Sequence, residues 1–311
     1  MPDLFRLPLD PDFPVPRKAL VTGAGGFVGS ALVARLGPHA GLALGGDGWR
    51  DAIAGADFRE ATVVHLAARV HESRGEAAAF ERDNTVKTRV LAEAAAAGGA
   101  ARFVFASTVK VHGEETGAAT FGPDSPPAPQ DPYARSKWLA EEALRDIASR
   151  TGLPVVIVRI PLTYGPGVGG NFRDLLRLAD SATPLPLAAI RNRRSLVHVR
   201  DLVEALLLAA GHPKAPGRAF IAAHPVPVST PELVTALRSA LGRPARLFPV
   251  PAFALEVAAT VAGLRDRMRR LTRSLEADPA TLMATLGWSP QVGLAAGVED
   301  TVAAWREGAK G

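Results

Sequence analysis

The sequence of 311 residues contains no cysteine, no lysine-rich tract and no long apolar run. Without cysteine the chain has neither disulfide bonds nor thiolate metal ligands, and we expect no bound metal. No apolar run reaches the roughly 20 residues that span a bilayer. The 36 basic residues exceed the 31 acidic ones only slightly, so nucleic acid is not an expected partner. With an N-terminus unlike a secretion signal, these absences predict a cytoplasmic protein.

A glycine-rich loop stands near the start of the chain, between an apolar strand and a helix. The run Ala19–Val21 precedes Gly23, Gly26 and Gly29, and apolar residues then recur at helical spacing through Leu36. Glycines at this spacing allow a tight turn, a close approach to a ligand and tight packing of the helix on the strand. A pyrophosphate can then lie against the amide groups of the helix N-terminus. The setting favours a dinucleotide site over a glycine-rich turn without a ligand.

Further strands and helices alternate along the chain. Continuous apolar runs predict buried parallel strands at Thr62–Ala67, Arg102–Thr108 and Val155–Arg159. Helices are predicted at Glu76–Ala97 and Tyr133–Ser149. This alternation is typical of an α/β fold, a doubly wound parallel sheet of the Rossmann type with helices on both faces.

The chain is predicted to divide into an arm, a domain and a lobe. Residues 1–17 are polar with five prolines and would form an extended arm. Residues 18–165 would form the dinucleotide-binding domain. Residues 166–311 would mostly form a smaller mixed α/β substrate lobe, with a segment around 195–210 returning to the Rossmann core. In that segment Asp201 is predicted to cap a helix.

The segment after the first helix leaves the cofactor undecided between NAD and NADP. Gly41–Gly46 is a poor strand by propensity, and Asp47 follows it, 24 residues after Gly23. An acid at this place can accept hydrogen bonds from the adenosine ribose, but Gly-Asp-Gly is equally typical of a turn. Only a short helix at Trp49–Ala54 precedes the next strand, so the sheet is predicted to lack a strand.

Two polar side chains are predicted to lie one turn apart on the helix that follows a proline-rich loop. Tyr133 and Lys137 project from the same face of that helix. A phenol has an unperturbed pKa of about 10, and a nearby ammonium lowers it, so the pair predicts a proton shuttle near neutral pH. Thr108, at a strand end, is placed to donate a hydrogen bond to the oxygen whose proton Tyr133 exchanges. The alternative is a surface tyrosine beside a solvated lysine, which the upstream glycine loop disfavours.

An apolar segment near the C-terminus is followed by arginines. Ala252–Leu264 is interrupted only by Glu256, and its basic continuation consists of Arg265, Arg267, Arg269, Arg270 and Arg273. Such a segment either lies as an amphipathic helix on an anionic membrane surface or is a buried helix whose arginines reach a phosphate ligand. We expect the buried helix, because the segment is short.

The order of these motifs resembles that of the extended short-chain dehydrogenase/reductases, in the branch of nucleotide-sugar epimerases, dehydratases and ketoreductases. The resemblance covers the chain from Lys18 to Trp288. The matching segments, in order, are T-G-A-G-G-F-V-G, H-L-A-A, Asn84 with Thr88, F-A-S-T-V-K-V-H-G, Y-A-R-S-K, R-I-P-L-T-Y-G-P-G, N-R-R-S-L-V-H-V-R-D-L and L-G-W-S-P.

The resemblance implies three groups of site residues. The catalytic residues would be Thr108, Tyr133 and Lys137. The cofactor would contact Gly23, Gly26, Phe27, Val28, Gly29, Asp47, Leu66, Ala67, Ala68, Asn84, Tyr133, Lys137 and Pro161. The nucleotide sugar would contact Thr108, Lys110, His112, Tyr133, Asn171, Arg194 and Arg270, whose guanidinium groups suit a diphosphate. For His112, a contact with the sugar and a structural role both stay open.

The resemblance also implies the reaction. The sequence looks most like a bacterial polysaccharide-pathway group, including O-antigen enzymes, that acts on UDP-N-acetylhexosamine derivatives. It implies NAD(P)-dependent reduction of a 4-keto-6-deoxy sugar, with UDP-sugar 4-epimerisation as the alternative. Both reactions exchange a hydride with C4 of the sugar while Tyr133 handles the proton on O4. Family members often dimerise through helices that correspond here to 86–97 and 133–149, which implies a homodimer.

Two other classes of function are weighed against this one. One is a protein that binds NAD(P) without turnover, for which Thr108, Tyr133 and Lys137 have no use. The other is a reductase of a ketone or aldehyde that carries no nucleotide. Asn171 and Arg194 favour a ligand with a diphosphate over that second class, although an arginine can also serve a structural ion pair.

Overall fold

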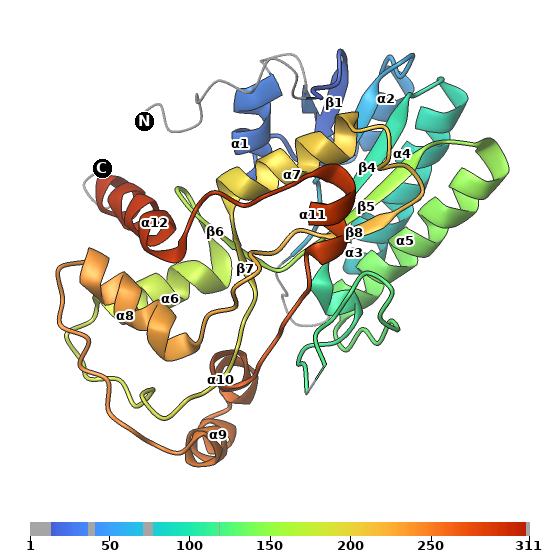
Figure 1. Cartoon of the computed structure of the whole chain (residues 1–311). Helices are drawn as coiled ribbons and strands as arrows, with labels where there is room; N and C mark the ends of the chain where they lie inside the picture. Colours follow the sequence, from blue (N-terminus) through green and yellow to red (C-terminus); the bar gives the residue numbers. More distant parts are fainter. Residues whose placement is uncertain (1–13, 37–40, 71–76, 118, 309–311) are drawn as a thin grey trace.

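The computed structural model describes residues 14–36, 41–70, 77–117 and 119–308 (Figure 1). The arm predicted for residues 1–17 therefore lies mostly outside the described part of the chain. A six-stranded sheet with helices on both faces forms one side of the molecule. A lobe of helices around a two-stranded sheet forms the other side (Figure 1).

The main sheet is parallel throughout, which confirms the predicted α/β, Rossmann-type fold. Its strand order is β2-β1-β3-β4-β5-β8. The strands are β1 (Ala19–Thr22), β2 (Gly41–Leu42), β3 (Thr62–His65), β4 (Arg102–Thr108), β5 (Val155–Ile160) and β8 (Ala219–Ile221). Because the strands run the same way, their carboxyl ends meet at one edge, where Thr22 pairs in register with His65. Polar residues at several strand ends are thereby gathered at one place.

Both faces of the sheet are apolar because both are covered. The covering helices are α1 (Phe27–Leu36), α2 (Trp49–Ala54), α4 (Lys87–Ala97), α5 (Pro132–Thr151) and α7 (Val199–Gly211). Val64 and Val104 pack with α1 and α7, whereas their neighbours Val63 and Phe103 pack with α4 and α5 on the opposite face. Alternate residues of each strand thus face different layers, which explains why these strands read as continuous apolar runs.

The lobe has its own core. Its elements are β6 (Leu162–Tyr164), β7 (Leu196–His198), α6 (Gly170–Asp180), α8 (Thr230–Ala240), α9 (Ala252–Val261), α10 (Arg265–Thr272) and α12 (Leu294–Gly308). β6 pairs in parallel with β7, and Phe172, Leu237 and Val298 meet in one apolar cluster. A further helix, α11 (Ala280–Leu286), packs against α7 and β8 at the main sheet. β6 was not predicted, since three residues carry no measurable periodicity.

The β2 edge of the main sheet is short. β2 has two residues, and within the described residues only α2 lies between β2 and β3. No strand lies outside β2 in that part of the chain, as the short interval predicted. This edge is therefore formed by loop backbone from Ala43 onward, close to where an adenosine ribose would lie in this fold.

The long helix predicted at Glu76–Ala97 contains a wide turn. Residues from 77 onward form α3 (Ala77–Phe80), a π-helical segment η1 (Glu81–Val86) and α4, in unbroken succession. A π turn holds one residue more than an α turn and frequently occurs at functional sites. Asn84 lies in this turn and is 1% exposed.

Asp201 does not cap α7, so that prediction is wrong. The N-cap is His198, whose side chain accepts a hydrogen bond from the amide of Arg200. The carboxylate of Asp201 instead accepts hydrogen bonds from the backbone amides of Gln291 (2.9 Å) and Val292 (3.2 Å). The long-range pairing with the segment before α12 outcompetes the local one, and it ties the C-terminal segment to the core.

The apolar segment at Ala252–Leu264 is not a buried helix, which corrects the expectation above. The helix breaks at Gly263, whose φ of +69° is left-handed, and α10 then runs in a new direction. Figure 1 shows α9 and α10 at the end of the molecule farthest from α2. Leu255 and Ala259 face the lobe, but Phe253 and Val261 are exposed.

Candidate active site

The glycine-rich loop joins β1 to α1 and forms one wall of a cavity of 890 Å³. Gly23 has a φ of +72°, and a Cβ there would lie 2.8 Å from the backbone nitrogen of Ala67. A Cβ at Gly29 would lie 2.0 Å from the carbonyl oxygen of Gly23. Only glycine at these two positions allows β1, α1 and the loop after β3 to approach this closely. The N-terminus of α1 is thereby brought to the cavity.

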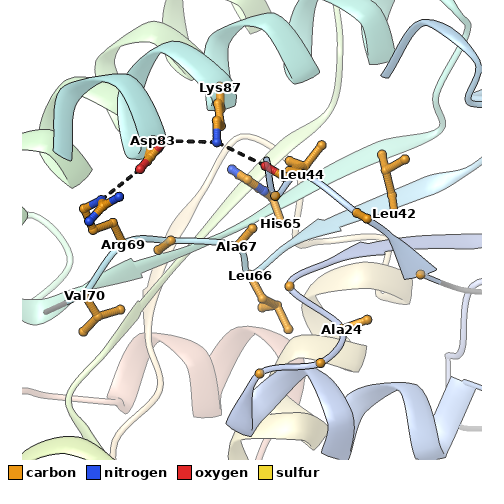
Figure 2. Close-up of a pocket in the computed structure, with 17 residues that line it drawn as sticks. Ala24, Leu42, Leu44, His65, Leu66, Ala67, Arg69, Val70, Asp83 and Lys87 are labelled. Atoms are coloured by element: carbon orange, nitrogen blue, oxygen red, sulfur yellow. Dashed lines mark hydrogen bonds and ion pairs between the residues drawn. The ribbon is translucent and has the colours of Figure 1, made fainter. Parts of the chain in front are cut away.

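The cavity lies at the carboxyl ends of β1, β2 and β3 (Figure 2). It is lined by Gly23, Ala24, Gly25, Gly26, Gly41, Leu42, Ala43, Leu44, Gly45, His65, Leu66, Ala67, Ala68, Arg69, Val70, Asp83 and Lys87. This wall consists mostly of the backbone of small residues, together with a few apolar side chains. Such a wall at a helix N-terminus fits the pyrophosphate and the flat adenine of NAD or NADP.

Ten of the thirteen predicted cofactor residues divide into three groups by their position, and the other three, Asn84, Tyr133 and Lys137, are described below. Gly23, Gly26, Leu66, Ala67 and Ala68 line the cavity. Phe27, Val28 and Gly29 form the first turn of α1, directly beyond it. Asp47 and Pro161 are not brought to the wall: the first is exposed, and the second is buried between β5 and β6. No carboxylate from the end of β2 therefore faces the cavity in this structure.

A charged group at the far side of the cavity was not predicted. The carboxylate of Asp83 lies 2.9 Å from Nε of Arg69 and 3.0 Å from Nζ of Lys87 (Figure 2). Although burial acts against it, hydrogen bonds from Arg82, Arg69 and Lys87 hold the pKa of Asp83 well below its usual range. Lys87 also donates to the carbonyl oxygen of Leu44 (3.1 Å) and so fixes the β2 edge to the helix. The i,i+4 spacing of Asp83 and Lys87 was the available signal.

His65 forms a buried relay behind the cavity wall. Its Nδ1 lies 2.6 Å from Oγ1 of Thr22, and its Nε2 lies 2.8 Å from Oγ1 of Thr88. Since the hydroxyl of Thr88 donates to the carbonyl oxygen of Asn84 (2.6 Å), Thr88 accepts from Nε2–H, and Nδ1 accepts from Thr22. Burial, with a smaller effect of the Lys137 charge, lowers the pKa of His65 to about 3. The ring is therefore neutral, as this pattern requires.

Asn84 connects the loop after β3 to the start of α5. Its Oδ1 accepts from the amide of Arg69 (2.8 Å), and its Nδ2 donates to the carbonyl oxygen of Arg69 (3.0 Å) and to Oγ of Ser136 (2.9 Å). The Ser136 hydroxyl donates in turn to the carbonyl oxygen of Tyr133 (2.8 Å). All polar atoms of the Asn84 side chain are used, so it positions the tyrosine relative to the cavity wall.

Tyr133, Lys137 and Thr108 are brought together at the carboxyl end of β4. The side chain of Asp131 caps α5 by accepting from the amide of Ala134 (2.6 Å), and the helix then presents Tyr133 and Lys137 on one face. The hydroxyl of Thr108 lies beside that of Tyr133 and favours its ionised form. Lys137 is 2% exposed, with its ammonium 3.9 Å from the centre of the Phe105 ring.

The charge state of this trio differs from the prediction. Burial, and then the charge of Asp131, raises the pKa of Tyr133 above its usual value, and the hydrogen bond from Thr108 opposes this only in part. Burial lowers the pKa of Lys137 to about 7, against the opposing charge of Glu141. The expectation that the ammonium lowers the tyrosine pKa fails here because burial destabilises both charged forms. Tyr133 is held as a neutral phenol.

A buried ion pair behind Lys137 was missed by sequence reasoning. Glu141, fully buried, accepts from Nε (3.0 Å) and Nη2 (2.6 Å) of Arg159 and from Oγ of Ser107 (2.6 Å). Although burial opposes ionisation, these contacts keep the pKa of Glu141 below its usual value. Two features of the sequence indicated this pair: Arg159 within the apolar run of β5, and Glu141 one helical turn after Lys137. Buried charges of this kind require a partner.

Lys110 and His112 follow Thr108 in the turn η2 (Val109–Val111) and just after it. The ammonium of Lys110 pairs with Asp131 and, at 2.8 Å, with Glu114. Nε2 of His112 accepts from Arg159 (3.0 Å), so its Nδ1–H donates to the carbonyl oxygen of Pro126 (3.3 Å). Both ring nitrogens of His112 are used inside the protein, a geometry that fits a structural histidine.

Arg194, Asn171 and Arg270 gather on the lobe. Nη1 of Arg270 donates to Oδ1 of Asn171 (3.1 Å), and Nη1 of Arg194 donates to the carbonyl oxygen of Arg273 (3.0 Å). Burial, and then repulsion by Arg270, lowers the pKa of Arg194 to about 10. Two guanidinium groups that repel each other are a ready site for an anion. The charge of Glu114 raises the pKa of Arg194 by a smaller amount, so the turn that carries Lys110 lies near this cluster.

The sequence of residues 49–223 matches the NAD dependent epimerase/dehydratase family. The chain is 35% identical over 318 residues to "UDP-glucose 4-epimerase" of Vibrio cholerae, covering 94% of this chain and 97% of the relative. Its fold is similar to that of a UDP-glucose 4-epimerase from Thermotoga maritima solved with UDP-glucose, with a TM-score of 0.75 at 22% identity, covering 94% and 99% of the chains.

A second solved structure, RMD from Pseudomonas aeruginosa complexed with NADPH, has a TM-score of 0.74 at 20% identity, covering 93% and 99% of the chains. At these identities the two solved structures show the fold alone. The family match extends over more than half of the chain, and the Vibrio relative covers nearly all of it. The chain therefore belongs to the NAD dependent epimerase/dehydratase family, in the nucleotide-sugar branch of the extended short-chain dehydrogenase/reductases.

Proposed function

We propose that this protein is a UDP-sugar 4-epimerase that uses NAD or NADP bound in the 890 Å³ cavity. The observation that carries the proposal is the neighbouring pair Thr108 and Tyr133 at the carboxyl end of β4, since the cavity lies at the carboxyl ends of neighbouring strands of the same sheet. The similarity to the Vibrio relative over nearly the whole chain supports a UDP-linked hexose as substrate. The amount of sequence shared favours epimerisation over the other reactions of the branch.

Residues of this chain would transfer the proton of the reaction and bind the diphosphate of the substrate. When bound, NAD(P) would accept a hydride from C4 of the sugar. The phenol of Tyr133 would first lose its proton to solvent; its phenolate would then take the proton of the O4 hydroxyl as C4 becomes a ketone, and Thr108 would hold that oxygen by a hydrogen bond. Arg194 and Arg270 would hold the diphosphate. Return of hydride and proton on the other face of the ketone completes epimerisation with no net change of cofactor.

A second candidate is reduction of a UDP-linked 4-keto-6-deoxy-N-acetylhexosamine. The raised pKa of Tyr133, whose hydroxyl lies beside that of Thr108, favours it, because a neutral phenol is ready to donate a proton to O4. In that reaction the ketone gains a hydride from NAD(P)H and a proton from Tyr133, and the cofactor is consumed. A role in polysaccharide precursor synthesis and a homodimer through α4 and α5 stay predictions.

One pair of incubations separates these reactions. The protein is mixed with UDP-glucose and NAD, and separately with a UDP-4-keto-6-deoxy-N-acetylhexosamine and NAD(P)H. Products are identified by chromatography while the absorbance of the reduced cofactor is followed. An isomerised UDP-sugar without net cofactor change supports the epimerase, and consumption of NAD(P)H with the keto sugar supports the reductase.

The variant Tyr133→Phe tests the proton assignment in either assay. It should lower turnover by about 10²- to 10⁴-fold, because the general acid–base group is lost, while cofactor binding measured by fluorescence is retained. Tyr164→Phe, which changes the chain's other tyrosine within the lobe core, is the matched control. Normal turnover by Tyr133→Phe would remove Tyr133 from the reaction, and a protein that binds NAD(P) but turns over neither substrate would contradict both candidates.

A further inference from the structure

An apolar stripe on α9 and the residues after it is exposed. Phe253, Val257, Val261 and Leu264 have exposed fractions of 72%, 63%, 87% and 47%. Spacings of four residues place Phe253, Val257 and Val261 on one side of α9, opposite the buried Leu255, which faces the lobe core, and Leu264 follows directly after the turn at Gly263. Scattered exposed apolar residues are common, but a continuous stripe marks an interaction surface.

The charges around this stripe are positive on the exposed side. Within residues 119–308, the guanidinium groups of Arg265 and Arg267 form neither an ion pair nor a hydrogen bond, and only Asp266 lies between them. Arg273, in contrast, is paired with Glu256 (2.7 Å). Glu256 is the only acid of α9, and it turns toward Arg273 and Thr272, away from the stripe.

A groove continues the stripe between α9 and α10. It has a volume of 310 Å³. It is lined by Leu255, Ala258, Ala259, Ala262, Leu264, Arg267, Met268 and Leu271. The left-handed Gly263 makes the sharp turn that opens it. An apolar floor with one guanidinium at the rim suits a hydrocarbon chain below an anionic head group.

We propose that α9, the groove and Arg265 and Arg267 form a docking surface for an anionic lipid bilayer, on which α9 lies parallel to the membrane plane. Helices with an apolar face and arginines beside it bind to such surfaces through buried apolar area and attraction to acidic lipids. No described helix is long and apolar enough to cross the membrane, so the contact would be peripheral.

The observations favour a bilayer over a second copy of the chain. In a two-fold contact the same patch meets itself, so the arginines beside the two stripes would approach each other and repel. A bilayer surface offers an extended area of negative charge without a fixed partner shape. The surface lies at the end of the molecule far from the cavity at β1 (Figure 1), and the proposal does not depend on the reaction catalysed.

Co-sedimentation of the full chain with lipid vesicles tests the proposal. Vesicles of phosphatidylcholine alone are compared with vesicles of phosphatidylcholine and phosphatidylglycerol in equal parts, at low and high salt. We expect binding to the vesicles that contain phosphatidylglycerol, weakened by salt. The double variant F253S/V257S should reduce the apparent affinity by at least about tenfold, because the apolar contact is lost. R265Q/R267Q should remove the preference for phosphatidylglycerol.

The control is Val226→Ser, which changes another exposed valine (64%) outside this segment and should bind as the unaltered chain does. Thermal unfolding and binding of NAD(P) show that each variant is folded. Three results would overturn the proposal: no binding to either vesicle, binding unchanged in F253S/V257S, or a concentration-dependent dimer in sedimentation velocity that these serines abolish. The last result would assign the surface to a second copy of the chain.

Discussion

Two ion pairs in this molecule have nearly the same geometry and opposite surroundings. In the main domain, Nε and Nη2 of Arg159 lie 3.0 and 2.6 Å from the oxygens of Glu141, and in the lobe the same atoms of Arg273 lie 3.0 and 2.7 Å from Glu256. Each carboxylate also accepts from one hydroxyl, that of Ser107 or Thr272.

The difference lies in burial. The Arg159 and Glu141 side chains are 3% and 0% exposed, whereas those of Arg273 and Glu256 are 46% and 21% exposed. Breaking a buried pair leaves a charge without water or a partner, but breaking an exposed one leaves both groups solvated. Distances alone therefore do not rank the two pairs. The buried pair fixes the residues around Lys137, and the exposed pair can yield when a ligand or surface approaches.

The largest expected effect is that of Glu141→Gln on stability. The free energy of unfolding should fall by about 3–5 kcal/mol, because Arg159 would keep a buried charge without its counter-ion. The midpoint of urea denaturation measures this. Glu142→Gln, which changes the exposed neighbouring residue on α5, should leave the midpoint nearly unchanged. If the two variants unfolded alike, burial would not be what distinguishes the pairs.

A smaller effect on the buried side follows from Lys137. The unfolded lysine keeps its proton up to about pH 10.4, while the folded one releases it near pH 7, so the unfolded state binds more protons in between. Raising the pH from 7 to 9 should therefore stabilise the ligand-free protein, on the order of 2 kcal/mol. His65 titrates below this window. The gain should be absent in Lys137→Met, and an equal gain in that variant would assign it to another group.

In the lobe, Arg194→Ala should affect ligand binding more than stability. Loss of a charged contact with a diphosphate should raise the KM for a UDP-sugar by about tenfold, with kcat little changed. Arg191→Ala, an exposed arginine in the same loop, is the control for a change in net charge. Steady-state kinetics with the substrate found active measures both, and an unchanged KM in Arg194→Ala would place the diphosphate elsewhere.

The smallest effect is expected for Glu256→Gln. The exposed pair with Arg273 should contribute less than about 1 kcal/mol to the free energy of unfolding, and salt should reduce it further. Urea denaturation at low and high salt measures this beside Glu141→Gln. A loss as large as that of Glu141→Gln would show that bidentate geometry, and not burial, sets the strength of these pairs.

The strand and helix pattern of the main domain was predictable because apolar periodicity is strong there. The glycine loop, β3, β4, β5 and the helix with Tyr133 and Lys137 are where the sequence places them. The three-residue strands of the lobe and the two-residue β2 were harder, since such short pieces are set by tertiary pairing. Asp201 shows the same effect, because its partners, Gln291 and Val292, are about 90 residues away.

In the site, the sequence motifs predicted the positions of side chains but not their protonation states. The positions of Thr108 at the end of β4 and of Tyr133 and Lys137 one turn apart on a helix were predictable, whereas the raised pKa of Tyr133 depends on its burial in the folded chain. Two partners of Glu141, Ser107 and Arg159, come from β4 and β5, so local spacing reveals only its contact with Arg145 one turn along α5. Asp47 shows the reverse case, in which a motif position is occupied but its side chain lies in solvent.

In the π-helical turn Glu81–Val86, the number of residues matters as much as which residues they are. Loss of one residue from this turn would restore a regular α-helix. Every residue before the lost one would then rotate by about 100° relative to α4, while the sequence motif around Asn84 could stay intact. Asn84 would then lose its hydrogen bond with either Ser136 or Thr88, because Asn84 and Thr88 lie on opposite sides of the deletion. Deletion of Thr85 or Val86 should thus be more harmful than most substitutions in this turn, although no charged or catalytic group is removed.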